Sequence, residues 1–206
     1  MAPIPAGSSD EIRGWTMCEG ILAHQHAGFH GVFAAFLAAV APVRILEIGT
    51  ADGGTILSLK RLLPSADIRS YDTRARDTHA AVRAAGVDIR IENIFTDTYD
   101  RLRPDGVDDV AAFIQADGVT VVLCDGGNKK GEFNSLSDLL KPGDFIMAHD
   151  YAESLAHFNA RINNRIWKWC ELTEDDIRDA SARNHLEPYM GAEFEAVVWV
   201  CKRKVR

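Results

Sequence analysis

The sequence predicts an α/β protein with a Rossmann-like, doubly wound and mostly parallel sheet of about seven strands and helices on both faces. Strand-like and helix-like segments alternate, and five successive strand–helix units imply parallel strands joined by crossover helices. The apolar run at 119–124 is continuous, as in a strand that is buried on both faces. A chain of 206 residues suits one sizeable domain better than two.

Local patterns of apolar residues and turn formers predict each element. Residues 31–40 have the apolar spacing of a packed helix, a helix at 54–63 stops at Pro64, and a helix at 173–184 starts with a capping-box-like pair, Thr173 and Asp176. A last strand at 194–202 suits an antiparallel position at or next to the sheet edge. The other strands are expected at 43–48, 68–72, 87–94, 119–124 and 145–148, and the other helices at 74–85, 107–117, 133–140 and 154–169.

The chain is expected to divide into a short N-terminal region and one main domain. Residues 1–41 would form an arm and cap helices over the active site, and residues 42–206 would form the main domain. The segment 18–30 carries three of the seven histidines. On a helix, His26 and His30 would share one face and could bind a metal, but we favour a segment that folds over the mouth of the site.

Composition excludes several classes of function. A net charge of −7 argues against nucleic acid or an anionic membrane as a partner, because binding to polyanions requires a positive surface. The four cysteines include no C-x-x-C pair, which argues against a zinc knuckle or a disulfide framework. The sequence shows neither a membrane-spanning apolar run nor a secretory signal. We therefore expect a cytoplasmic protein, and homodimerisation stays open.

The most informative motif lies at residues 43–55, Val-Arg-Ile-Leu-Glu-Ile-Gly-Thr-Ala-Asp-Gly-Gly-Thr. An apolar run ends in an acidic residue, a glycine-bearing turn follows, and an amphipathic helix begins, as in a strand that leads into a cofactor loop. Gly49 permits a sharp turn, and Gly53 or Gly54 permits close approach of backbone or ligand. The spacing, E-x-G-x-x-x-G-G, differs from the G-x-G-x-x-G of dinucleotide-binding domains. An ordinary strand–helix connection is the alternative.

Polar side chains follow the predicted strands at the point where each strand ends. The carboxyl ends of parallel strands meet at one edge of a sheet, where ligands of such folds bind. Any one of these residues could instead cap a helix or form a turn, but the set indicates a site. The residues are Glu47, Asp72, Asn93, Asp125, His149 and Asp150.

Besides the loop at 43–55, two stretches carry a resemblance to a known family, the segment 140–151 and the motif Asp125-Gly126-Gly127-Asn128-Lys129-Lys130. With these stretches, residues 45–151 resemble the class I S-adenosylmethionine-dependent methyltransferases. The resemblance is closest to the metal-dependent O-methyltransferases of the catechol type and of the macrolide-sugar and cephalosporin-hydroxylase-like group. It implies transfer of a methyl group to a hydroxyl of a small molecule, as in natural-product biosynthesis. It places Glu47 near the amino group of the cofactor, Asp72 on the ribose and Asn93 near the adenine. The implied cofactor-binding residues are Glu47, Gly49, Thr50, Ala51, Gly53, Asp72, Asn93 and Asp125.

The resemblance also implies a divalent cation on Asp125, His149 and Asp150. Two carboxylates and water favour Mg²⁺, whereas a histidine ligand would shift the preference toward Mn²⁺, Fe²⁺ or Zn²⁺. His149 stands where the family usually has an acid, and Asn128 where it often has a basic residue. The proton acceptor would then be Lys129, Lys130 or His149, although both lysines could equally belong to a solvated loop.

Some alternatives remain open at this stage. Trp167, Trp169, Tyr189 and Trp199 either line the acceptor pocket or fill the core, and Trp199 is expected in the core. A nicotinamide-dependent oxidoreductase would share the sheet and the acid after the second strand. A non-catalytic protein that binds S-adenosylmethionine is the other alternative.

Overall fold

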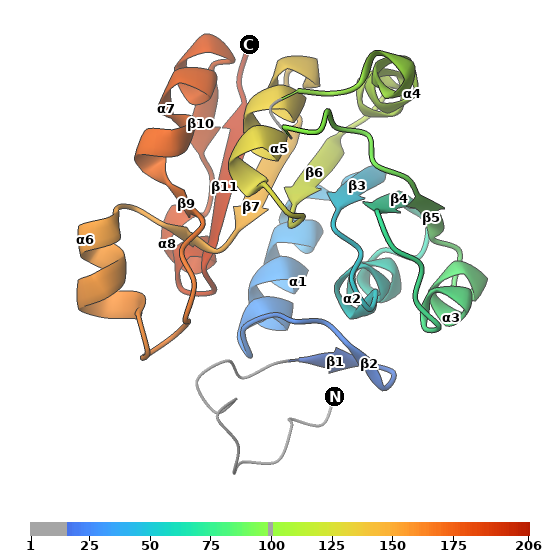
Figure 1. Ribbon diagram of the computed structural model, residues 1–206, viewed down its shortest axis with the longest axis horizontal. Helices are drawn as coiled ribbons and strands as arrows, with labels where there is room; N and C mark the ends of the chain where they lie inside the picture. The colour runs from blue at the N-terminus through green and yellow to red at the C-terminus, as the bar shows by residue number, and fades with distance from the viewer. Residues whose placement is uncertain (1–15, 99–100) are drawn as a thin grey trace.

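A seven-stranded sheet forms the centre of the computed structural model, which describes residues 16–98 and 101–206 (Figure 1). Its strand order is β10-β11-β7-β6-β3-β4-β5. The strands β3 to β7 are parallel, whereas β11 pairs antiparallel with both β7 and β10, next to the edge as predicted. The strands span Arg44–Ile48 (β3), Asp67–Asp72 (β4), Asp88–Ile91 (β5), Thr120–Cys124 (β6), Phe145–His149 (β7), Leu186–Pro188 (β10) and Trp199–Lys204 (β11).

Helices cover both faces of this sheet, which confirms the predicted doubly wound arrangement (Figure 1). Successive strand residues point to opposite faces, so Ile45 joins one apolar cluster and Leu46 the other. The first cluster includes side chains of α1, α2 and α3, and the second includes side chains of α4, α5 and α7. These helices span Phe29–Val40 (α1), Gly54–Leu62 (α2), His79–Ala84 (α3), Pro104–Gln115 (α4), Lys129–Leu136 (α5) and Glu174–Arg183 (α7).

The strand order reverses between β3 and β6. From β3 the chain moves outward to β4 and β5, and it then returns to place β6 and β7 on the other side of β3. In open α/β sheets, a reversal of this kind leaves a crevice beyond the carboxyl ends of the two central strands. We therefore expect a ligand site beside the residues that follow Ile48 and Cys124.

Two predicted elements near the C-terminus are wrong. The helix expected at 154–169 is only α6 (Leu155–His157) with a π turn at Phe158–Ile162, because Asn163 leaves the helical conformation (ψ 124°) and Asn164 then adopts a left-handed φ of 56°. The strand expected from residue 194 starts at Trp199, since Phe194 lies in α8 (Gly191–Glu195) and packs against Phe33. Three short elements complete the region: β8 (Tyr151–Ala152), β9 (Leu172–Thr173) and a 3-10 turn at Ser137–Leu139.

The N-terminal region differs from the predicted cap helices. Residues 1–15 of the predicted arm lie outside the described part, and a hairpin of β1 (Met17–Cys18) and β2 (Ile21–Leu22) follows. A Cβ on Gly54 would collide with the backbone of β2, so the hairpin packs directly on α2. Helix α1 was expected to cap the active site, but its apolar side chains pack in the core. Within the described ranges, every helix is too short or too polar to cross a membrane.

Candidate active site

The ends of β3 and β6 meet at Gly49 and Asp125. The amide of Asp125 donates to the carbonyl of Ile48 (2.9 Å), and Gly49 has a φ of +94°. A Cβ on Gly49 would overlap the carbonyl oxygen of Asp125. Only glycine satisfies both conditions, which explains the first glycine of the motif. Gly53 also has a positive φ, +89°, and precedes the first turn of α2.

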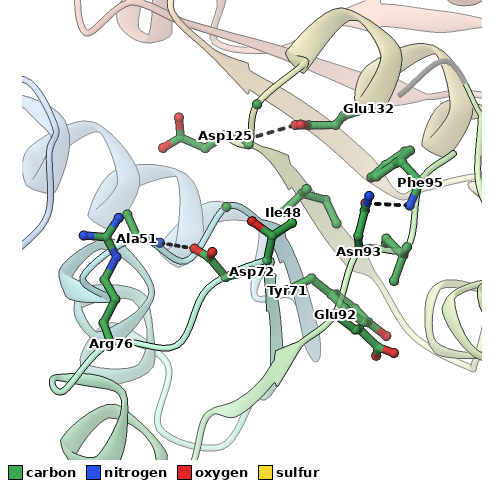
Figure 2. Close-up of a pocket in the computed structure, with 15 residues that line it drawn as sticks. Ile48, Ala51, Tyr71, Asp72, Arg76, Glu92, Asn93, Phe95, Asp125 and Glu132 are labelled. Carbon is green, nitrogen blue, oxygen red and sulfur yellow. Dashed lines mark hydrogen bonds between the residues drawn. The ribbon is translucent and has the colours of Figure 1, made fainter. Parts of the chain in front are cut away.

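A cavity of about 230 Å³, which we call the strand-end cavity, opens beyond β3, β4 and β5 (Figure 2). Five of the predicted cofactor residues line it: Gly49, Ala51, Asp72, Asn93 and Asp125. Asp72 is fixed by backbone donors, since its Oδ2 accepts from the Ala51 amide and its Oδ1 from the Arg74 amide, each at 2.8 Å. Each oxygen of Asp72 keeps a second lone pair, so the carboxylate can still bind hydroxyl groups in the cavity.

Glu47 and Gly53 border neither this cavity nor the next one. Glu47 is 1% exposed and accepts a hydrogen bond from Ser70, while its Oε1 has no hydrogen-bond partner within the described ranges. Burial raises the pKa of Glu47 to about 8. The structure therefore places this predicted cofactor residue in the protein interior, outside both cavities.

A second cavity, of about 350 Å³, contains two tryptophans and is called the tryptophan cavity here. Trp167 and Trp169 line it, with an edge-to-face contact of 5.6 Å between their ring centroids. Trp199 is in the core as expected, 1% exposed, and Tyr189 packs against Phe145. The tryptophan cavity is lined by Ala23, His24, Gly49, Thr50, Ala51, Thr55, Asp125, His149, Asp150, Trp167, Trp169 and Glu171.

The predicted metal ligands converge at the border of the two cavities. Asp125, His149 and Asp150 offer three ligand atoms that all lie within 4.8 Å of one another. His149 Nδ1 is 3.1 Å from Asp125 Oδ1 and 3.7 Å from Asp150 Oδ1. Neighbouring strand residues normally point to opposite faces, but Asp150 has a left-handed φ of 56°, which lets both side chains enter one cluster. Burial opposes a charged imidazole, yet the carboxylates of Asp150 and Asp125 raise the pKa of His149.

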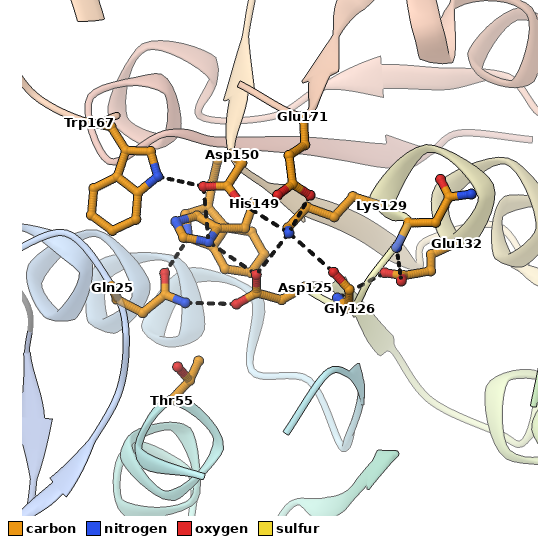
Figure 3. Close-up of polar contacts among 12 residues, drawn as sticks. Gln25, Thr55, Asp125, Gly126, Lys129, Glu132, His149, Asp150, Trp167 and Glu171 are labelled. Atoms are coloured by element: carbon orange, nitrogen blue, oxygen red, sulfur yellow. Dashed lines mark hydrogen bonds and ion pairs between the residues drawn. The ribbon is translucent and has the colours of Figure 1, made fainter. Parts of the chain in front are cut away.

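Lys129 also belongs to this cluster (Figure 3). Its Nζ lies 2.9 Å from Glu171 Oε2, 3.1 Å from Asp150 Oδ2 and 3.8 Å from Asp125 Oδ1. Burial would lower the pKa of Lys129, but Asp125 and Asp150 outweigh it and raise that pKa, so the ammonium form persists.

Lys130 and Asn128 have other roles than those predicted for their positions. Lys130 Nζ pairs with Asp176 Oδ1 at 2.9 Å, and its side chain is 56% exposed, so the structure does not bring it into the cluster. Asn128 caps α5, since its Oδ1 accepts from the Gly131 amide at 3.0 Å. This cap sets the start of the helix and thereby which lysine faces the carboxylates.

Three buried or partly buried residues of the site were not predicted from the sequence. Gln25 is fully buried and donates from Nε2 to Asp125 Oδ2 at 2.8 Å (Figure 3). Glu132 accepts hydrogen bonds from the Gly126 and Asn128 amides, and burial raises its pKa to about 7. Glu171 lines the tryptophan cavity and pairs with Lys129. Only Glu132 lies in a local pattern that could have indicated it, four residues after the cap residue Asn128.

The cluster fits a divalent cation as a donor set. The two carboxylates suit Mg²⁺ or Mn²⁺, and an imidazole beside them shifts the preference toward Mn²⁺, Fe²⁺ or Zn²⁺. The ammonium of Lys129 between Asp125 and Asp150 is a stand-in cation, which shows that the space between them accommodates positive charge.

Comparison with known proteins then identifies the fold. No protein-family model and no curated protein matches the sequence. Among solved structures, the apo form of CmcI matches with a TM-score of 0.65 and 14% identity over 100% of this chain and 82% of CmcI. Its Mg-SAM form (SAM, S-adenosylmethionine) matches with a TM-score of 0.60 and 15% identity over 98% of this chain and 81% of CmcI. A putative O-methyltransferase from Nostoc punctiforme matches with a TM-score of 0.53 and 12% identity over 86% of this chain and 56% of its own.

The chain has the class I methyltransferase fold. Identities of this size support a shared fold only, and the roles of the site residues rest on their geometry in this chain. In this methyltransferase fold, the strand-end cavity lies at the reversal of strand order, where open α/β sheets bind their ligands.

Proposed function

We propose that this protein transfers a methyl group from S-adenosylmethionine to a hydroxyl group of a small molecule, with the help of a divalent cation. One observation carries the proposal: Asp125 borders both the strand-end cavity and the tryptophan cavity. A methyl donor in the first and an acceptor in the second would therefore meet at one carboxylate. The fold neighbours support this chemistry, since they include a putative O-methyltransferase and CmcI with Mg-SAM.

The strand-end cavity suits the donor. In the proposed complex, Asp72 accepts hydrogen bonds from the two ribose hydroxyls, and Asn93 lies beside the adenine. The loop from Gly49 to Ala51 borders both cavities, where the methionine part and its sulfonium would lie. The sulfonium supplies an electrophilic methyl group, and the rigid strand ends hold it in a fixed direction.

The tryptophan cavity suits the acceptor. Asp125 and Asp150 would hold the cation, with His149 beside them, and a bound cation would lower the pKa of the acceptor hydroxyl. Of the three predicted proton acceptors, we favour His149: it lines the tryptophan cavity, and a cation on Asp125 and Asp150 would offset the carboxylate charge that raises its pKa. Lys129 is held as an ammonium ion, and Lys130 lies outside the cluster.

Binding and transfer experiments test this proposal together. Calorimetry should show binding of S-adenosylmethionine and no binding of NAD(P), and the purified protein should methylate members of a panel of small hydroxyl compounds. Asp150→Ala should abolish transfer but retain cofactor binding, because Asp150 lines only the tryptophan cavity. Lys130→Met is the matched control and should retain both properties. Binding of NAD(P) alone would support an oxidoreductase, and full activity in excess chelator would contradict the role of the cation.

A further inference from the structure

Lys129 occupies the space in which the proposed cation would bind. Its Nζ lies 3.1 Å from Asp150 Oδ2 and 3.8 Å from Asp125 Oδ1, and the residue is 5% exposed. The same two carboxylates belong to the candidate metal cluster. Figure 3 shows the ammonium group directed into the space between Asp125, Asp150 and Glu171.

An ammonium ion and a divalent cation would compete for the negative charge of these two carboxylates. A carboxylate-bound Mg²⁺ lies about 2.1 Å from its oxygen ligands, so it would sit against the Nζ of Lys129 in a site with little solvent. Two positive charges at that separation repel each other strongly, because burial reduces the screening. The binding of one cation therefore weakens the binding of the other.

The cluster also provides a place for the displaced ammonium. The shortest carboxylate contact of Lys129 is to Glu171, at 2.9 Å, and the Glu171 side chain is 47% exposed. Lys129 can thus leave Asp125 and Asp150 while keeping one ion pair. Asp125 and Asp150 together carry the two negative charges that one divalent cation neutralises.

We propose that Lys129 is an internal competitor of the divalent cation: it neutralises Asp125 and Asp150 when no cation is bound, and cation binding displaces it toward Glu171. This inference rests on the cation site of the proposed function and is independent of the methyl acceptor. It predicts that the unmodified protein binds divalent cations weakly for a site with two buried carboxylates.

Manganese binding provides the direct test, with free Mn²⁺ measured by electron paramagnetic resonance. Lys129→Met removes the charge and keeps the length of the side chain, so its affinity for Mn²⁺ should be at least about tenfold higher than that of the wild type. Lys129→Arg keeps the charge and should bind Mn²⁺ as weakly as the wild type. Lys130→Met, one residue away and paired with Asp176, should leave Mn²⁺ affinity unchanged.

A second measurement uses the wild-type protein, in case Lys129→Met does not fold without a cation. Reductive methylation followed by peptide mass spectrometry reports the accessibility of each lysine. Saturating Mn²⁺ should increase the labelling of Lys129 severalfold, with Lys130 as the internal reference. Unchanged labelling of Lys129 in saturating Mn²⁺ would overturn the competition.

The outcomes separate this inference from the proposed function. Equally tight Mn²⁺ binding by the wild type and Lys129→Met would overturn the competition and leave the cation-assisted reaction standing. An absence of Mn²⁺ binding in both proteins would overturn both statements about the cation. Calorimetry with S-adenosylmethionine, run in chelator, tests the donor site independently of either result.

Discussion

The side-chain amide of Gln25 donates a 2.8 Å hydrogen bond to Asp125, a residue 100 positions further along the chain. Its oxygen accepts a 2.8 Å hydrogen bond from the indole of Trp199. Gln25 thereby connects the N-terminal segment, the core and the carboxylate that borders both cavities. The segment before α1 is thus a structural part of the site.

Replacement of Gln25 should reduce both activity and stability. Gln25→Leu leaves the buried indole N–H of Trp199 without its partner, which costs about 1–3 kcal/mol, and removes one hydrogen bond from Asp125. We expect a lower urea midpoint and methyl transfer reduced at least about tenfold, because Asp125 loses the group that orients it. His26→Ala, at a neighbouring position, is the control for the segment. Wild-type activity in Gln25→Leu would show that Asp125 is positioned without this bond.

Asp72 should determine cofactor affinity. Asp72→Asn retains the shape of the side chain but exchanges one acceptor oxygen for a donor, so binding of S-adenosylmethionine should weaken about 10- to 100-fold. Isothermal titration calorimetry measures this change directly. Asp67→Asn, at the exposed start of the same strand, should bind the cofactor as the wild type does. Equal affinities in the two variants would place the ribose elsewhere.

Gly49 should not tolerate a side chain. In Gly49→Ala, the new Cβ meets the carbonyl of Asp125 and the residue keeps a positive φ, so we expect a loss of about 2–4 kcal/mol in unfolding free energy. Gly127→Ala is the matched control in the next turn, because nothing lies within 4 Å of its Cβ position. Urea denaturation compares the two variants. Similar losses in both would contradict the steric explanation.

Stability should fall as pH rises through the range set by Glu47. Burial raises the pKa of Glu47 from 4.5 to about 8 in the folded protein, so the folded state retains a proton that the unfolded chain releases above pH 4.5. The stabilisation of the folded state that comes from neutral Glu47 is thus fully present below pH 4.5 and is lost as pH approaches 8. Glu47→Gln removes this dependence, so its stability relative to the wild type should increase between pH 5 and 8, by at most about 5 kcal/mol.

Denaturation of both proteins at several pH values tests the Glu47 prediction. Parallel curves of unfolding free energy against pH would mean that Glu47 is ionised in the folded protein. Glu187→Gln, on an exposed strand, controls for the loss of one carboxylate.

Trp169 should contribute to acceptor binding. Its side chain lines the tryptophan cavity and the residue is 40% exposed, so Trp169→Ala should fold normally. Loss of an aromatic contact of about 1–2 kcal/mol should raise the acceptor KM about 5- to 30-fold. The affinity for S-adenosylmethionine should stay unchanged. A change in cofactor affinity with no change in KM would assign the ring to the donor side.

The fold and most of the site residues at the carboxyl ends of the strands were predictable from the sequence. Asp72, Asn93, Asp125 and Asp150 come together because the carboxyl ends of parallel strands share one edge, a relationship that needs only the order of elements. The apolar pattern of 119–124 likewise sufficed to predict β6.

Other features depend on contacts that no local pattern records. Gln25 belongs to the site because Trp199, far along the chain, reaches its side chain. Neighbouring residues on a helix point about 100° apart, so the residue at which α5 starts decides that Lys129 points inward. The helix was predicted to start at residue 133, which left both lysines in a loop. The apolar spacing of 154–169 indicated a helix, but Trp167 instead turns inward and donates to Asp150.

The two cavities draw their walls from different parts of the chain. The strand-end cavity is built mainly from the ends of β3, β4 and β5, whereas Trp167, Trp169 and Glu171 come from the irregular stretch between α6 and β9. Under the proposed function, substitutions at Trp169 and its exposed neighbours would alter the acceptor cavity and leave the residues that line the donor cavity in place. Asp125, which lines both cavities, would then restrict which acceptors such a variant could place beside the donor.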